Sequence, residues 1–175
     1  MIDDRALRLI LEYEGFHKRL PDGRCAPYLC PAGVPTIGFG SVWRADGTHV
    51  AMTDPPMSRD EAMQLFGIEI EQKCLPAVGR LITIPLHPLM LGALVSFCFN
   101  AGGGALKASN LRRAVNERRW ADVPAEFAKW RFGGGKELPG LVRRRAAEAA
   151  MFMAGVRDQS GEPIDAWATS ILRAA

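Results

Sequence analysis

Hydrophobic positions recur every three or four residues along most of the chain, a spacing typical of amphipathic helices. The first such segment carries Glu14 on its apolar face and ends at the glycine that follows. Ser58 and Glu61 have the spacing of a capping box, which predicts a helix through Cys74 that Pro76 breaks or kinks. Further helices are predicted at 85–99, at 109–118 with Ser109 as its cap, after Asp122 as a cap, at 141–154 and at 164–172, and the glycines at 133–135 predict a turn.

The segment from residue 19 to residue 53 has a different composition, with many prolines and glycines between short β-prone pieces. These pieces lie at 28–29, 36–37 and 49–50, and they predict a small irregular sheet. Gly38 and Gly40 flank Phe39 and let the backbone approach a neighbour closely. The sequence leaves open whether this neighbour is another chain segment or a ligand.

Length and composition indicate one globular domain over residues 1–175, because 48% of the side chains are apolar and the chain can bury a sizeable core. The net charge of +3 favours an anionic partner only weakly. The apolar stretch 89–101 contains polar residues and is shorter than the roughly 18 residues that span a bilayer, so it predicts a buried helix. The first five residues show no secretory signal pattern.

Cysteine and histidine spacing gives no support for a metal site, and neither a metal nor another cofactor is predicted. The four cysteines form no Cys-x-x-Cys pair and are expected to be reduced. The three histidines are isolated and are expected to serve packing or capping, with His87 next to a helix start. The glycines at 102–104 lack the neighbours of a phosphate-binding loop and are expected to end the helix before them.

Glu14 is the candidate for acid chemistry. A carboxyl group on an apolar face and in the last helical turn favours its protonated form, which suits a general acid. A frayed, exposed glutamate is the structural alternative. Cleavage of a glycosidic bond pairs such an acid with a second group, and the segment after the helix offers four: Asp22, Cys30, Thr36 and Asp46.

Several ordered motifs bear on this chemistry. They are Glu14-Gly15-Phe16, the run from Ala26 to Gly40 that contains Pro35-Thr36-Ile37-Gly38-Phe39-Gly40, the run 93–100, Trp130, and Gly140-Leu141-Val142-Arg143-Arg144-Arg145. With them the sequence resembles the phage-type lysozymes, the endolysins of glycoside hydrolase family 24, from about Leu7 to Gly155. The family pattern is a Glu, then an Asp or Cys, then a Thr, and the five residues between Cys30 and Thr36 match it.

The resemblance implies a lysozyme-like α+β fold that is mostly α, with a cleft between two lobes. The β-rich lobe would span about 16–56, the helical lobe about 57–155, and a C-terminal helical extension 156–175. Glu14 would protonate the bond between N-acetylmuramic acid and N-acetylglucosamine, while Cys30 and Thr36 hold or activate water. The substrate-binding residues implied are Gly40, Asn100, Ser109, Trp130 and Arg143.

The chain departs from the family pattern at two places. Fifteen residues separate Glu14 from Cys30, where about eight are common, so the stretch 17–25 is expected to hold an extra loop. Cys30 replaces the more familiar Asp, and its thiol would need Arg24 or another cation to lower its pKa. Asp22 could supply the missing negative charge or simply form a turn. Arg143 is expected to pair with Glu14, and at least one of residues 143–145 to face inward.

The expected partner is the peptidoglycan glycan strand, with weak contact to anionic envelope polymers as a second interaction. No nucleic acid is expected as a partner, and the protein is expected to be a monomer. The resemblance places the protein in the host cytoplasm until a separate pore protein releases it. A lytic transglycosylase is the alternative nearest to a muramidase, and a catalytically silent wall-binding module comes from another class. Nucleic-acid binding through Arg112, Arg113, Arg118 and Arg119 is a weaker alternative to a solvated face.

Overall fold

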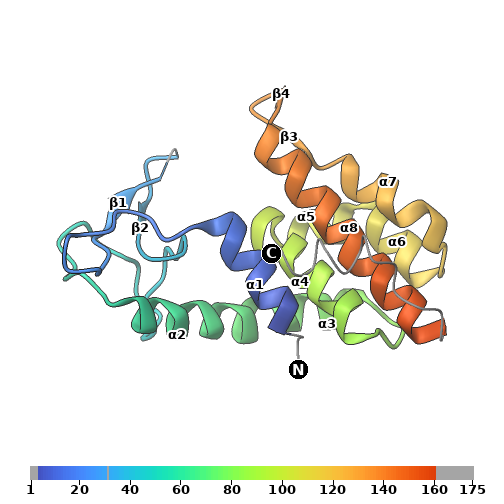
Figure 1. The fold of residues 1–175 in the computed structure, drawn as a ribbon, viewed down its shortest axis with the longest axis horizontal. Coiled ribbons are helices and arrows are strands. Elements are labelled where there is room, and N and C mark those ends of the chain that lie inside the picture. The colour runs from blue at the N-terminus through green and yellow to red at the C-terminus, as the bar shows by residue number, and fades with distance from the viewer. Residues whose placement is uncertain (1–3, 31, 161–175) are drawn as a thin grey trace. The chain divides into compact units, whose positions relative to one another are not determined.

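The computed structural model describes residues 4–30 and 32–160. Residues 14–73 form one compact unit, and the described residues on either side of that range form another. Helices dominate, and the described residues contain two small antiparallel sheets of two strands each (Figure 1). The predicted fold class, α+β and mostly helical, is confirmed. None of the helices in these ranges is both long and apolar enough to cross a bilayer.

The first sheet lies in the unit 14–73. Strand β1 (Tyr28–Leu29) pairs with β2 (Pro35–Thr36), so that Tyr28 lies opposite Thr36. The β-prone piece at 28–29 is thus a strand, the second piece begins one residue earlier than predicted, and the third contributes only an isolated bridge through His49. The same unit contains an apolar cluster of Cys25, Ile37, Val50 and Leu65, with Phe16 and Met57 packed against it.

Helix α2 (Arg59–Glu69) begins with the predicted capping box. The Ser58 backbone N–H donates to Glu61 Oε2 at 2.7 Å, and the Glu61 N–H donates to Ser58 Oγ at 3.1 Å. The helical run reaches Cys74 as predicted, but its last part is a π-helical segment, η1 (Ile70–Cys74). Pro76 lacks an N–H and its ring crowds the preceding turn, which explains the π-helical winding just before it. Helix α3 (Leu75–Leu81) follows directly and contains Pro76 in its first turn.

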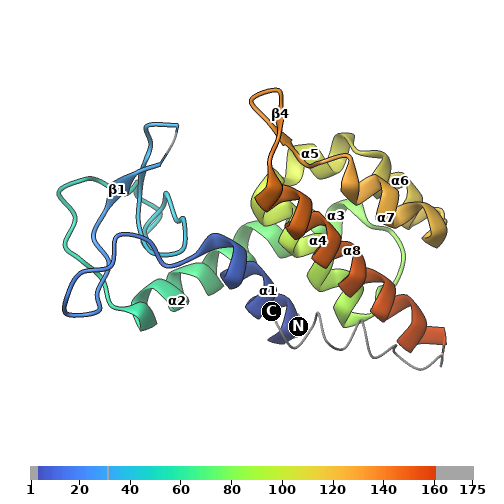
Figure 2. The ribbon, with the colours of Figure 1, turned by 45° about the horizontal axis from the view of Figure 1, so that its top comes forward.

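The core of the other unit is built on three helices: α1 (Asp4–Glu14), α4 (Pro88–Ala101) and α8 (Pro139–Ser160). Helix α4 is the predicted buried helix, and it runs beside α8 in two views (Figure 1 and Figure 2). A Cβ atom at Gly92 would lie 2.3 Å from that of Ala6, so α1 and α4 pack at closest approach there. His87 caps α4 as expected, since its Nδ1 accepts from the Leu89 N–H at 3.3 Å.

Shorter helices complete this unit: α5 (Gly103–Ala108), α6 (Asn110–Asn116), the 3-10 turn η2 (Trp120–Asp122) and α7 (Val123–Ala128). Two of the glycines expected only to end α4 begin α5 instead, because the chain re-enters a helix after Gly102. Ser109 caps α6 as predicted. Asp122 precedes α7, but its side chain caps no helix N–H because it binds Arg119.

The glycines at 133–135 form a turn as predicted. They connect β3 (Phe132–Gly133) to β4 (Lys136–Glu137), and Gly134 and Gly135 adopt the positive φ angles that a tight hairpin requires. The helix predicted at 164–172, within the C-terminal extension 156–175, lies outside the described residues.

Candidate active site

The β1–β2 hairpin holds two of the three predicted catalytic residues. The Cys30 N–H donates to Val34 O at 3.0 Å and the Gly33 N–H donates to Cys30 O at 2.8 Å, which closes the turn around the partly exposed thiol. Thr36 is buried, and its Oγ1 donates to Val34 O at 2.9 Å while also lying within hydrogen-bonding reach of the Cys30 thiol. A hydroxyl has one proton, so Thr36 donates to one of these acceptors at a time.

The turn itself changes the acidity of Cys30. The backbone N–H groups of Val34 and Ala32, followed by the Thr36 hydroxyl, stabilise the thiolate and lower the pKa of Cys30 below its usual value. The expectation that Arg24 would supply this effect is not met, because Arg24 binds Asp22, with Nε 2.8 Å from Oδ2. Asp22 is exposed in this ion pair, and its negative charge is matched by the guanidinium group.

Cys30 is predicted to be the thiol that iodoacetamide alkylates first. The thiolate is the reactive form, so a lowered pKa moves the rate profile to lower pH than that of an ordinary thiol. Cys25 should react slowly, because it is buried and burial raises its pKa. Mass spectrometry of samples quenched at successive pH values measures the alkylation rates of Cys30 and Cys25. Thr36→Val should shift the Cys30 profile toward higher pH, and an unshifted profile in the wild type would contradict this account.

Glu14 is the last residue of α1 and its side chain is half-buried. A Cβ atom at Gly40 would lie 3.5 Å from Glu14 Oε2, and Gly40 has φ +94°, where other residues are strained. Gly38, by contrast, faces another chain segment, since its Cβ atom would lie 2.9 Å from that of Ala62. The close neighbour of Gly38 is therefore a chain segment, helix α2, whereas Gly40 leaves room beside the candidate acid Glu14.

Tyr28 is a candidate site residue that the sequence reasoning did not single out. It lies opposite Thr36 and two positions before Cys30, so all three side chains share one face of the hairpin. Burial raises the pKa of Tyr28, and the negative charges of Cys30 and then Glu14 raise it further. Its hydroxyl therefore stays protonated close to both groups. The signal that could have revealed it is the alternation of side chains along the strand.

The structure thus brings Glu14, Cys30 and Thr36 into one compact unit, with Tyr28 under the influence of the first two. Neutral Tyr28 and Thr36 hydroxyls can hold a water molecule by hydrogen bonds, and the Cys30 thiolate can accept its proton. The Glu14 carboxyl can donate a proton to a leaving group. Such a set can hydrolyse a glycosidic bond.

Four further predicted substrate-binding residues lie in the other unit. Asn100 lies in the last turn of α4, and its Oδ1 accepts a hydrogen bond from Arg145. The buried Ser109 hydroxyl donates to Leu106 O and accepts from the Arg112 N–H. Trp130 packs edge-on against Phe97, with ring centroids 5.2 Å apart, and Arg143 is exposed on α8. Their roles toward substrate, and the pairing of Arg143 with Glu14, stay predictions.

Two arginines of the run 143–145 face inward, where at least one was expected. Arg144 Nε lies 3.1 Å from Glu148 Oε1, and Arg145 Nη1 lies 2.7 Å from Glu148 Oε2. Ser96 on α4 donates its hydroxyl to the same carboxylate at 2.7 Å. Burial raises the pKa of Glu148, and the two guanidinium groups oppose that shift. Both inward arginines therefore belong to a buried ionic network.

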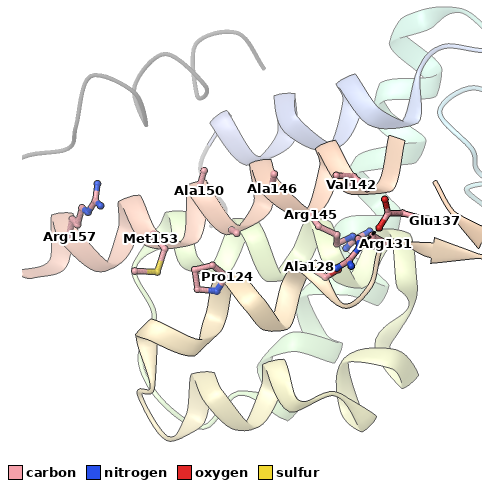
Figure 3. A pocket seen from close by; sticks show the side chains of 11 residues that line it. Pro124, Ala128, Arg131, Glu137, Val142, Arg145, Ala146, Ala150, Met153 and Arg157 are labelled. Carbon is pink, nitrogen blue, oxygen red and sulfur yellow. Dashed lines mark hydrogen bonds and ion pairs between the residues drawn. The ribbon is translucent and has the colours of Figure 1, made fainter. Parts of the chain in front are cut away.

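A separate pocket of about 690 Å³ lies between α7 and α8 (Figure 3). Its floor is mostly apolar, formed by alanines of both helices together with Pro124, Val142 and Met153. Its one carboxylate, Glu137, forms an ion pair with Arg131. Glu14, Cys30 and Thr36 are not among its lining residues, so the chemistry proposed for the hairpin is not that of this pocket.

Comparisons with known proteins identify the family to which the chain is similar. The family model described as Phage lysozyme matches residues 12–148. An endolysin of Acyrthosiphon pisum secondary endosymbiont phage 1 is 32% identical over 155 residues, which cover 86% of this chain and 97% of the relative. The endolysin of Bacillus phage B103 is 35% identical over 120 residues, 69% of this chain, but this match spans only 43% of that relative's length.

Among solved structures, the muramidase domain of SpmX from Asticaccaulis excentricus superposes with a TM-score of 0.71 at 28% identity. The match covers 87% of this chain and 97% of that domain. The similarity therefore extends over nearly the whole of the domain that carries the name muramidase.

Proposed function

The chain belongs to the phage lysozyme family, and we propose that it is a muramidase that hydrolyses the β-1,4 bond between N-acetylmuramic acid and N-acetylglucosamine in peptidoglycan. The observation that carries the proposal is that the Glu14 carboxyl, the Cys30 thiol and the Thr36 hydroxyl belong to one compact unit, in which Thr36 lies within hydrogen-bonding reach of Cys30 and the charges of Cys30 and Glu14 both act on Tyr28. The endolysin and muramidase names of its relatives support the same activity.

In this proposal Glu14 is the general acid. As the bond from the anomeric carbon to the glycosidic oxygen breaks, its electron pair passes to that oxygen, which takes the Glu14 proton. Water attacks the anomeric carbon from a position held by the Thr36 and Tyr28 hydroxyls. The Cys30 thiolate accepts the proton of this water and, being negative, also stabilises the positive charge that develops on the sugar ring. Both products are closed-shell sugars, one with a new reducing end.

A lytic transglycosylase, which needs no residue that activates water, is the alternative outcome of the test, and the names of the relatives do not favour it. The two reactions leave different ends on the glycan. We expect mass spectrometry of digested peptidoglycan to show reducing muramic acid ends that carry the mass of one added water. Anhydro-muramic ends would reject hydrolysis in favour of the transglycosylase. Protein that pellets with peptidoglycan and releases no fragments would instead be a silent wall-binding module.

The substrate proposed is the glycan strand, and Gly40, beside the Glu14 carboxyl, is the predicted substrate-binding residue within the same unit. Contacts from Asn100, Ser109, Trp130 and Arg143 are part of the proposal. The reported phage relatives are endolysins, so we place the chain in the lysis of a bacterial host. A separate pore protein that releases it to the wall, and a monomeric state, are also proposed.

A further inference from the structure

His17 binds the backbone of the candidate acid. Its Nε2 lies 2.5 Å from the main-chain oxygen of Glu14, the last residue of α1. The ring also covers Gly15, where a Cβ atom would lie 3.3 Å from both Cε1 and Nε2. Gly15 has φ +66°, the left-handed conformation that turns the chain out of the helix. The imidazole therefore closes the end of the helix at the residue that carries the acid.

The same side chain contacts the hairpin. The His17 and Tyr28 rings are 5.5 Å apart between centroids and inclined by 57°. The His17 backbone N–H donates to Gly38 O at 3.4 Å, which ties the residue to the chain just after β2. His17 thus lies between the Glu14 backbone and the strand whose face carries Tyr28 and Cys30.

A helix end needs such a partner for physical reasons. The last four carbonyl groups of a helix have no partner within it, and the terminal turn frays unless another donor binds them. Glu14 occupies this terminal position, so fraying would displace its Cα atom and with it the carboxyl group. A general acid must stay within hydrogen-bond reach of the oxygen that it protonates, and a displacement of about 1 Å can cost on the order of a hundredfold in rate.

We propose that His17 is a positioning residue for the reaction proposed above, holding Glu14 at a fixed place relative to Tyr28, Cys30 and Thr36. The inference rests on that proposed function. His17 acts through the Glu14 backbone and the Tyr28 ring and touches no reacting atom. It lies within the stretch 17–25, where an extra loop is expected.

The test is steady-state cleavage of soluble, uncross-linked glycan strands by full-length variants. His17→Ala should lower kcat about tenfold and leave KM within about twofold, because the acid is displaced while the glycan-binding surface is kept. His17→Gln should recover most of the loss, since its amide N–H can reach the same carbonyl oxygen. His49→Ala is the matched control. His49 stacks on Trp43 at 3.8 Å within the same unit, and its removal should leave kcat unchanged.

Amide hydrogen exchange gives a readout that does not depend on activity. His17→Ala should speed exchange at the Glu14 amide, and His17→Gln should restore its protection, while thermal unfolding shows that each variant is folded. Wild-type kcat in His17→Ala, an equal loss in His49→Ala, or no recovery in His17→Gln would overturn the positioning role alone. A wild-type protein that releases no reducing ends would overturn the proposed function and this role with it.

Discussion

Glu14→Gln is expected to abolish clearing of bacterial wall suspensions while leaving the fold intact. The amide has nearly the same shape as the carboxyl group, so the half-buried position beside Gly40 can accept it. It carries no proton that it can donate at neutral pH, and loss of a general acid costs roughly 10²- to 10⁴-fold in rate. Turbidity of the suspension and release of reducing ends measure the effect, and circular dichroism checks the fold.

Glu12→Gln provides the matched control for this experiment. Glu12 lies two residues earlier on the same helix and is exposed, so the change removes one negative charge from α1 without touching the site. It should clear walls at the wild-type rate. Full activity in Glu14→Gln would remove Glu14 from the mechanism, and an equal loss in Glu12→Gln would point to the charge of the helix instead.

Features that depend on neighbours in the sequence could be predicted from it. The capping box needs only Ser58 and Glu61, three residues apart, and the hydrogen bonds form where that spacing puts them. The cap at Ser109 follows the same logic. The side chain of Asp122 shows the limit of such reasoning. A carboxylate near a helix start can cap it, but here a nearby guanidinium group, that of Arg119, competes and binds it.

The sequence can propose residues for the candidate site, but it does not reveal their electrostatics. A family pattern can indicate Glu14, Cys30 and Thr36, whereas the donors that lower the pKa of Cys30 are backbone N–H groups of a turn. The sequence does not show where backbone N–H groups will point, whereas it does display cationic side chains near Cys30, such as that of Arg24. Tyr28 was missed for a related reason. Its place on the face of Cys30 and Thr36 depends on the strand register, which only the folded hairpin defines.

The arginine run shows the same division between local and distant information. An α-helix places residues 144, 145 and 148 on one side, so the i,i+4 pair of Arg144 with Glu148 follows from spacing. Glu148 has a further partner, Ser96, which lies on α4, 52 residues away from it in sequence. No local sequence pattern connects Ser96 with Glu148. Packing of α4 against α8 buries the carboxylate together with both guanidinium groups, and this burial sets the energy of the network.

Glu148→Ala should therefore be among the most destabilising single substitutions in the chain. Arg144, Arg145 and Glu148 are each at most 2% exposed, so Glu148→Ala removes a buried carboxylate that two buried guanidinium groups bind. Breaking a buried ion pair from one side costs about 3–5 kcal/mol. Urea unfolding measured by circular dichroism should show that loss in the free energy of unfolding.

Glu137→Ala tests whether burial, rather than the loss of an ion pair as such, causes the effect. Glu137 pairs with Arg131 at the β3–β4 hairpin, where both side chains are more than a third exposed. Water and salt already screen that pair, so its removal should change the unfolding free energy by about 1 kcal/mol or less. Similar losses in the two variants would contradict the burial argument. A small loss in Glu148→Ala alone would mean that water enters the core and solvates the two arginines.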